Sequence, residues 1–170
     1  MKHWPLLVAA VATLAAAVFA GLYFTKAATT SAASAACGEQ RLFGHVSGLT
    51  RKSGHVDLRF DPALLTTGVT ANTAAAEDGA VPPGQPVPND SYVIDEGHRL
   101  LTYRVAPTAA ITVLTRGGPG PLGETPIGLP ELEHIVNGGP HRALFEPLDS
   151  GVWIKVHVDT VCSLDQQYRP

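Results

Sequence analysis

The chain has 170 residues, enough for one domain, and carries 12 Lys and Arg against 15 Asp and Glu. From Cys37 onward there are ten basic and fifteen acidic residues, because Lys2 and Lys26 both precede that point. This mildly acidic balance argues against a protein that binds the phosphate backbone of nucleic acids, and also against a basic module for membrane surfaces.

Residues 1–26 predict export. An uncharged, mostly apolar run extends from Trp4 to Thr25, about long enough to cross a bilayer core as a helix, and Lys26 ends it. One interpretation is a secretory signal peptide, cut in the small-residue stretch that follows, where residues 33–35 have the A-x-A form. The other is an uncleaved transmembrane signal anchor. Both predict an extracytoplasmic protein, either secreted or attached to the membrane through its N-terminal helix.

Residues 27–40 are predicted to be a linker, and residues 41–170 a single β-rich extracytoplasmic domain. Ala, Ser and Thr alone make up residues 27–36, and this composition cannot build a core. The two cysteines, Cys37 and Cys162, lie near the two ends of the domain. In an oxidising compartment they favour one disulfide, which requires the first and last elements to be neighbours. Two free thiols and a lipid-modified Cys37 are the alternatives.

The first elements form a predicted β-hairpin, with strands over residues 42–50 and 55–60 and a polar turn over residues 51–54. On this hairpin His45 and His55 would lie about 16 Å apart, too far to share a metal ion. The second strand alternates in polarity, which predicts a core face and a solvent face. The core face holds Val56, Leu58 and Phe60, and the solvent face holds His55, Asp57 and Arg59.

The middle of the chain is predicted to combine one short helix with short strands. Asp61-Pro62 would end the second strand, and Thr70 would cap a helix over residues 71–78. A stiff proline-rich loop follows over residues 81–90. Short strands are then expected over residues 92–94, 100–105 and 111–114.

Residues 130–136 predict a second short helix, because Pro130 occupies the first turn and glycines follow the last one. Residues 152–158 alternate as a strand, and residues 161–164 extend or re-enter the sheet. Trp153 is expected in the core, with a ligand-facing position as the alternative. Six or seven short strands with one or two helices predict a mainly β fold. A small half-open antiparallel barrel, OB-like or SH3-like, is favoured, and an α+β roll is the alternative.

Chemistry-bearing motifs are few. Residues 118–123 match G-x-G-x-x-G in form, but two prolines and the lack of a following helix predict a plain loop. No Lys or Arg occurs between Arg59 and Arg99, whereas six acids do. If the loops that carry these acids converge, hard oxygen ligands could hold calcium, or a carboxylate pair could act in acid–base catalysis. The candidate metal ligands are Glu77, Asp78 and Asp90, and the candidate ligand-binding residues are Asp90, Asp95, Glu96, His98 and Arg99.

Several segments resemble a family of small exported actinobacterial proteins with no assigned function. They are Leu58–Ala63, Thr67–Asn72, Val87–Asp90, Asp95–Tyr103 and Ser163–Tyr168. The resemblance covers most of the chain after residue 41. It implies export and a single domain, and it supplies no catalytic residues.

These observations lead to one function and two alternatives. The chain is expected to be a non-enzymatic binding or envelope-associated module, exported or tethered to the membrane. Its expected partner is a cell-envelope component or another protein, and not nucleic acid. The alternatives are a cell-envelope hydrolase that uses carboxylates of residues 77–96, and a calcium-binding domain.

Overall fold

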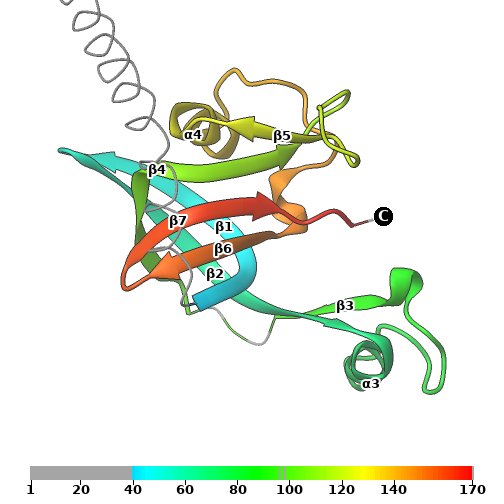
Figure 1. Ribbon diagram of the computed structural model, residues 1–170. Helices are drawn as coiled ribbons and strands as arrows, with labels where there is room; N and C mark the ends of the chain where they lie inside the picture. Colours follow the sequence, from blue (N-terminus) through cyan, green and yellow to red (C-terminus); the bar gives the residue numbers. More distant parts are fainter. Residues whose placement is uncertain (1–39, 96, 98, 170) are drawn as a thin grey trace, which may run out of the picture. The chain divides into compact units, whose positions relative to one another are not determined.

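The computed structural model describes residues 40–95, 97 and 99–169 (Figure 1). The predicted signal segment, most of the predicted linker, Cys37, Glu96 and His98 lie outside the described residues. In the described part of the chain no helix has both the length and the apolar character that crossing a membrane requires.

Seven strands and two α-helices make up the described unit, together with two short 3-10 turns, η1 (Pro88–Asp90) and η2 (Leu148–Ser150). In chain order the elements are β1 (Gln40–Lys52), β2 (His55–Thr67), α3 (Gly68–Glu77), β3 (Ser91–Ile94), β4 (Leu101–Leu114), β5 (Glu124–Ile127), α4 (Leu129–Asn137), β6 (Val152–His157) and β7 (Thr160–Gln166).

Five of the strands close into a barrel. β1 pairs with β2, β2 with β4, β4 with β7, β7 with β6, and β6 with β1 again. The predicted mainly β fold with a small barrel and short helices is therefore confirmed. The barrel is closed, however, and not half-open, and its β4–β7 pair is parallel. The pairs that close it join segments far apart in the chain, for which a sequence has no local signal.

The predicted hairpin is confirmed, and its second strand is longer than expected. Lys52 faces His55 across a tight turn in which Gly54 has a φ of 87°. β2 does not end at Asp61-Pro62 but continues to Thr67. Pro62 is accommodated because β4 pairs with β2 only as far as Phe60. Proline has no backbone N–H, but no hydrogen bond between β2 and β4 is lost, because the two strands no longer pair at this position.

β4 is a single strand of 14 residues, where two strands were predicted. It runs through residues 106–110, and its register against β7 shifts between Val105 and Ala110. β5, which pairs with the end of β4, had no recognised sequence signal.

Beyond the barrel β2 pairs with β3, and α3 packs on this ribbon (Figure 1). We call residues 64–94 the arm. The predicted helix is confirmed, but it begins earlier than expected. Gly68, with a φ of 61°, turns the chain out of β2, and Thr67 precedes the helix without a side-chain cap, so the predicted cap at Thr70 is wrong. The apolar centre of the arm is small: Ala71, Ala75 and Val87 are buried there, with Val81 and Tyr92 packed against them.

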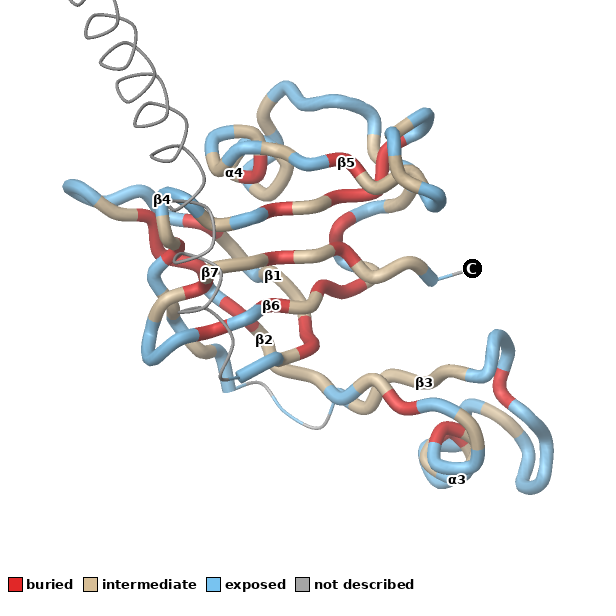
Figure 2. The backbone as a smooth tube through the Cα atoms, in the orientation of Figure 1, coloured by how far each residue is buried: buried red, intermediate tan, exposed pale blue. Residues whose placement is uncertain are grey.

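The main core lies inside the barrel, where buried residues of all five strands meet (Figure 2). α4, a predicted helix that is confirmed, covers one end and buries Leu132 completely. It is held there by Arg51, whose Nε donates to Glu133 Oε1 at 3.1 Å, and by Asn137, whose Nδ2 donates to the carbonyl of Leu49 at 3.2 Å.

Candidate functional site

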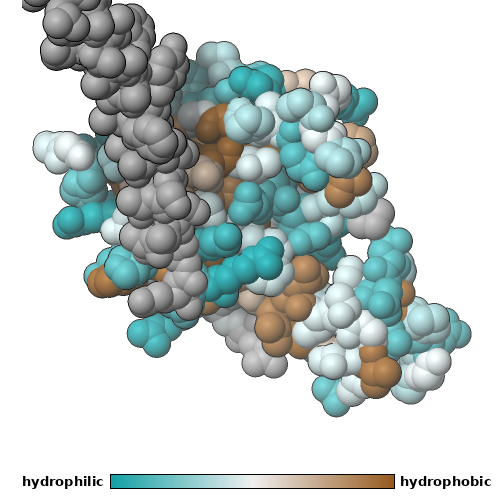
Figure 3. All heavy atoms as spheres, viewed as in Figure 1, coloured by the Kyte–Doolittle hydropathy of each residue, from teal (hydrophilic) through white to brown (hydrophobic). Residues whose placement is uncertain are grey.

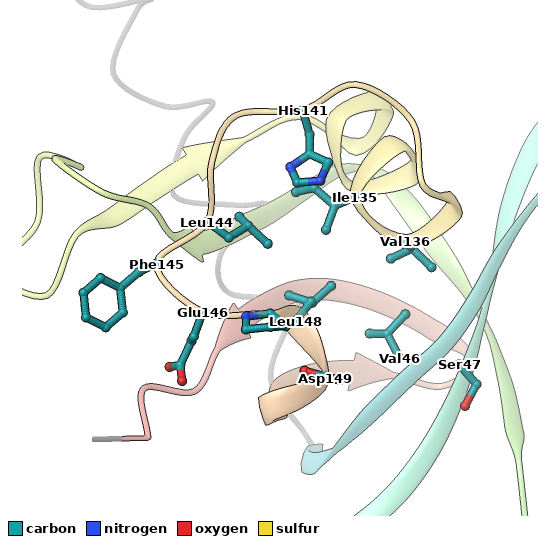
Figure 4. Close-up of a pocket in the computed structure, with 11 residues that line it drawn as sticks. Val46, Ser47, Ile135, Val136, His141, Leu144, Phe145, Glu146, Leu148 and Asp149 are labelled. Carbon is teal, nitrogen blue, oxygen red and sulfur yellow. The ribbon is translucent and has the colours of Figure 1, made fainter.

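A pocket of about 500 Å³ opens between α4, the middle of β1 and the loop that leads from α4 to β6 (Figure 4). We call it the α4 pocket. Its volume is in the range of sites for small ligands. The apolar lining residues are Val46, Ile135, Val136, Leu144, Phe145, Pro147 and Leu148, and the polar ones are Ser47, His141, Glu146 and Asp149.

A β-bulge shapes the β1 side of the pocket. The pairing of β1 with β2 shifts between Val46 and Gly48, so Ser47 is the extra residue. Bulges bend a strand and re-aim its side chains, and they are frequent beside binding sites. Here the bulge lets two consecutive residues, Val46 and Ser47, line the same pocket, which a regular strand with a period of two does not allow.

The loop wall is held by hydrogen bonds from the barrel. The side chain of Gln166 donates to the carbonyls of Glu146 and Pro147 at 3.0 and 3.2 Å. His45 Nδ1 donates to the carbonyl of Asp149 at 2.9 Å. The N–H of Phe145 donates to the carbonyl of Leu114 at 2.8 Å. Because these bonds come from strands of the barrel, the pocket is formed before any ligand arrives.

The polar groups lie at the rim of the pocket. His141 reaches over it from the loop, and Leu144 lies beside it, opposite Ile135 of α4 (Figure 4). Glu146 Oε1 already accepts the backbone N–H of Arg169 at 3.1 Å. The ring of Phe145 turns outward and contacts Tyr168, with 5.9 Å between ring centroids. The result is an apolar floor under a rim that offers a hydroxyl, an imidazole and two carboxylates.

Two of the predicted ligand-binding residues, Asp90 and Asp95, do not lie together. Asp90 and Asp95 stand at opposite ends of β3, about 16 Å apart at the rise of an extended strand. Arg99 lines a separate hollow of about 460 Å³ together with Leu64 and Ile94. Glu96 and His98 lie outside the described residues, so their part of the prediction stays a prediction.

The calcium site proposed for Glu77, Asp78 and Asp90 is not supported. Within residues 40–95, 97 and 99–169, no three His, Cys, Asp or Glu side chains gather as a metal site requires. Asp78 instead accepts a hydrogen bond from the hydroxyl of Tyr92 at 2.9 Å. This bond raises the pKa of Tyr92, because it stabilises the protonated phenol.

Trp153 was expected in the core, and it lies on the outer face of the barrel instead. Val152 and Ile154 are the fully buried positions of β6, so the residue between them points outward. The guanidinium of Arg41 stacks over the indole at 4.1 Å, and Trp153 Nε1 donates to Gln167 Oε1 at 2.7 Å. The ring of Phe43 lies next to the indole, with 5.2 Å between centroids. Trp153 is thus half-buried by its own neighbours.

Asp57, expected in solvent, is 8% exposed. Lys52 Nζ lies 2.6 Å from its Oδ2, and His55 Nε2 lies 3.3 Å from its Oδ1. The hydrogen bond from Lys52 lowers the pKa of Asp57, with further help from the charge of Arg104. Glu131, on α4, is affected in the same way: the guanidinium of Arg142, in the loop after the helix, lowers its pKa. Both carboxylates serve as partners in ion pairs.

Cys162 is half-buried on β7, and no cysteine in the described part of the chain is a free thiol. Its predicted partner Cys37 lies outside the described residues, so the Cys37–Cys162 pairing stays a prediction. Residues 118–123 form the turn region between β4 and β5, as expected for a plain loop.

The residues of the α4 pocket were not singled out from the sequence. They come from β1, α4 and an irregular loop, and share no spacing or motif. Only the cluster of loop-forming residues at the end of α4, Asn137 to Pro140, marks the start of a long irregular connection. Comparison with protein-family models, with curated proteins and with solved structures found no match to this chain.

Proposed function

We propose that the chain is a non-catalytic binding module and that the α4 pocket holds its ligand. The observation that carries this proposal is a pocket of about 500 Å³ whose loop wall is hydrogen-bonded to the barrel. A preformed, mostly apolar cavity with a few polar groups is the usual form of a small-molecule site. Its rim fits a ligand with an apolar body and a hydrogen-bond donor or positive charge, because Glu146 and Asp149 supply acceptors there.

Binding is favoured over hydrolysis by the placement of the acids. Two of the carboxylates of residues 77–96 proposed for an envelope hydrolase, Asp90 and Asp95, stand at the two ends of one strand. A general acid and a general base must both reach the same substrate bond. The extended strand between them holds this pair about 16 Å apart, too far to act on one bond.

We propose further that the barrel is OB-like, the first of the two predicted alternatives. Five strands with a parallel β4–β7 pair, and a helix inserted between β4 and β6 over the end of the barrel, support this assignment. OB folds are five-stranded Greek-key barrels that act mainly as binding modules. The acidic balance of the domain favours a ligand other than nucleic acid.

We also propose that the module is extracytoplasmic, either secreted or held at the membrane by residues 4–25, and that its ligand is a component of the cell envelope or a protein there. Intact mass of the protein from membrane and medium fractions of its own host tests this. A full-length mass in membranes means an anchor, and a mass starting after residue 35 in the medium means cleavage. A full-length protein in the cytosol would contradict export.

The ligand site is tested by NMR on the full-length chain in an uncharged detergent, with labelled methyl groups on Ile, Leu and Val. Fragments that combine an apolar ring with an amine or amide N–H should shift the methyl signals of Ile135, Val136 and Leu148 in a saturable way. Ser47→Phe fills the mouth of the pocket and should weaken this binding at least tenfold. Thr50→Phe, an exposed position on the same strand, is the matched control and should leave it unchanged. Equal binding by the two variants would contradict the proposed site.

A further inference from the structure

The arm carries an open strand edge. β3 pairs with β2 through four residue pairs, from Leu64–Ile94 to Thr67–Ser91. It is the last strand of the sheet, and no strand within the described residues pairs with its other side. Such an edge presents N–H and C=O groups that another extended segment can use.

The two ends of this edge are acidic. Asp90 directly precedes β3 and Asp95 directly follows it. Arg99 and Arg169 border the arm, where each lines a hollow against it. Among the described residues, neither arginine forms an ion pair with Asp90 or Asp95. Both carboxylates are therefore available to a positively charged partner.

Apolar side chains also lie on the β2–β3 ribbon, near the end of β3. Leu64, the partner of Ile94, is 58% exposed. The hollow of about 460 Å³ next to these two side chains also includes Pro62 and Ala63. Figure 3 shows apolar surface, in brown, at the place where the arm leaves the barrel. This hollow can receive an apolar side chain from a segment laid along β3.

The sheet of the arm has only two strands among the described residues, β2 and β3. α3 packs on the face that carries Tyr92, while Leu65 and Val93 lie on the other face and are half-buried. A two-stranded ribbon is marginally stable by itself, and a third strand adds both hydrogen bonds and covered apolar area.

We propose that β3 is a docking edge at which an extended, basic segment of a partner protein adds as a third strand. The added strand would place Lys or Arg side chains beside Asp90 and Asp95 and an apolar side chain in the hollow at Leu64 and Ile94. Backbone hydrogen bonds supply affinity in this mode of recognition, and the flanking charges and the hollow supply specificity. This site is separate from the α4 pocket.

A second copy of the chain fits this edge less well. Two β3 strands paired antiparallel about their centres would place Asp90 of one copy opposite Asp95 of the other. Like charges directly opposite one another destabilise a strand pair. The same two residues attract a basic segment, which is why the partner is assigned a positive charge.

The test uses the full-length chain in an uncharged detergent and a fluorescent hexapeptide, in which a lysine at each end flanks four alternating valine and threonine residues to match the four residues between Asp90 and Asp95. A peptide with glutamate in place of both lysines is the matched control. Fluorescence anisotropy should show that the lysine peptide binds on the order of tenfold more tightly, and that added salt narrows the difference. Hydrogen exchange should show new protection at residues 91–94.

Two variants test whether the preference for the lysine peptide depends on Asp95. Asp95→Lys, at an exposed position, should remove most of the preference for the lysine peptide, whereas Asp159→Lys, in the exposed turn between β6 and β7, should preserve it. Asp90 is less suitable because its φ is 53°. Ser47→Phe should leave peptide binding unchanged, which separates this proposal from the α4 pocket.

Three results would overturn the proposal. They are equal affinity for the two peptides, protection at residues other than 91–94, and protection of residues 91–94 without peptide in a chain that sedimentation shows to be a dimer. The third result would assign the edge to a second copy.

Discussion

The side-chain oxygen of Gln166 accepts the backbone N–H of Leu114 at 2.8 Å, in a position that is 8% exposed to solvent. The nitrogen of the same amide donates to the carbonyls of Glu146 and Pro147, which lie in the loop wall of the α4 pocket. One buried side chain thus connects β7, the end of β4 and the pocket loop.

Replacing this amide should destabilise the protein. Gln166→Leu leaves the buried N–H of Leu114 without an acceptor, and an unsatisfied buried group costs about 1–3 kcal/mol. Thermal unfolding should show a lower melting temperature than that of the wild type. Gln167→Leu is the neighbouring control. Its partner Trp153 is only half-buried, so water can replace the lost bond and the loss should be smaller. Equal losses would contradict the role given to Gln166.

Leu132 anchors α4 to the barrel, and truncating its side chain should strongly destabilise the protein. Leu132 is fully buried between the helix and the barrel. Leu132→Ala should lower the free energy of unfolding by about 2–5 kcal/mol, because it removes buried methyl groups and leaves a cavity. Leu122→Ala, at a side chain that is 49% exposed, should change it little. Denaturant unfolding of both variants checks the difference, and similar values would show that α4 contributes little to the core.

A methyl group at Gly44 should not fit. A Cβ there would lie 2.1 Å from the carbonyl oxygen of Asp61 and 2.8 Å from the ring of Phe60. Gly44→Ala should therefore destabilise the protein by about 1–3 kcal/mol through overpacking. Gly48→Ala is the control on the same strand, because nothing lies within 4 Å of its Cβ position. A stability unchanged by both substitutions would mean that β1 and β2 move apart easily.

The ion pair at Asp57 should make stability depend on pH. The folded state lowers the pKa of Asp57 below its ordinary value of 3.8, so the carboxylate stabilises the fold above that value. As pH falls through the folded pKa, Asp57 becomes protonated in both states and this stability is lost. The wild type should therefore melt at a higher temperature than Asp57→Asn near pH 6.

The difference between these two proteins should shrink below pH 4, which melting curves from pH 6 to pH 2.5 measure. Lys52→Met, which removes the first partner of Asp57, should show part of the same loss near pH 6. A constant difference between wild type and Asp57→Asn at all pH values would show that the charge of Asp57 does not stabilise the fold.

The sequence by itself determined the local elements. The β1–β2 hairpin follows from a polar turn between alternating strands, and α4 from a proline in its first turn and a glycine after its last. β6 follows from its period-two pattern. Each of these signals depends on residues close together in the chain, which is why they could be read without a structure.

Only the tertiary structure decided how the barrel closes and where its pocket lies. The parallel β4–β7 pair and the hydrogen bond from Leu114 to Gln166 join residues separated by some 50 positions or more. The α4 pocket combines a bulge at Ser47 with a loop near residue 145, and no spacing connects the two. The outward position of Trp153 could be read from the alternation along β6, where it shares a face with Lys155 and His157. Only the pairing of β6 with β1, however, brings Arg41 and Phe43 against its indole.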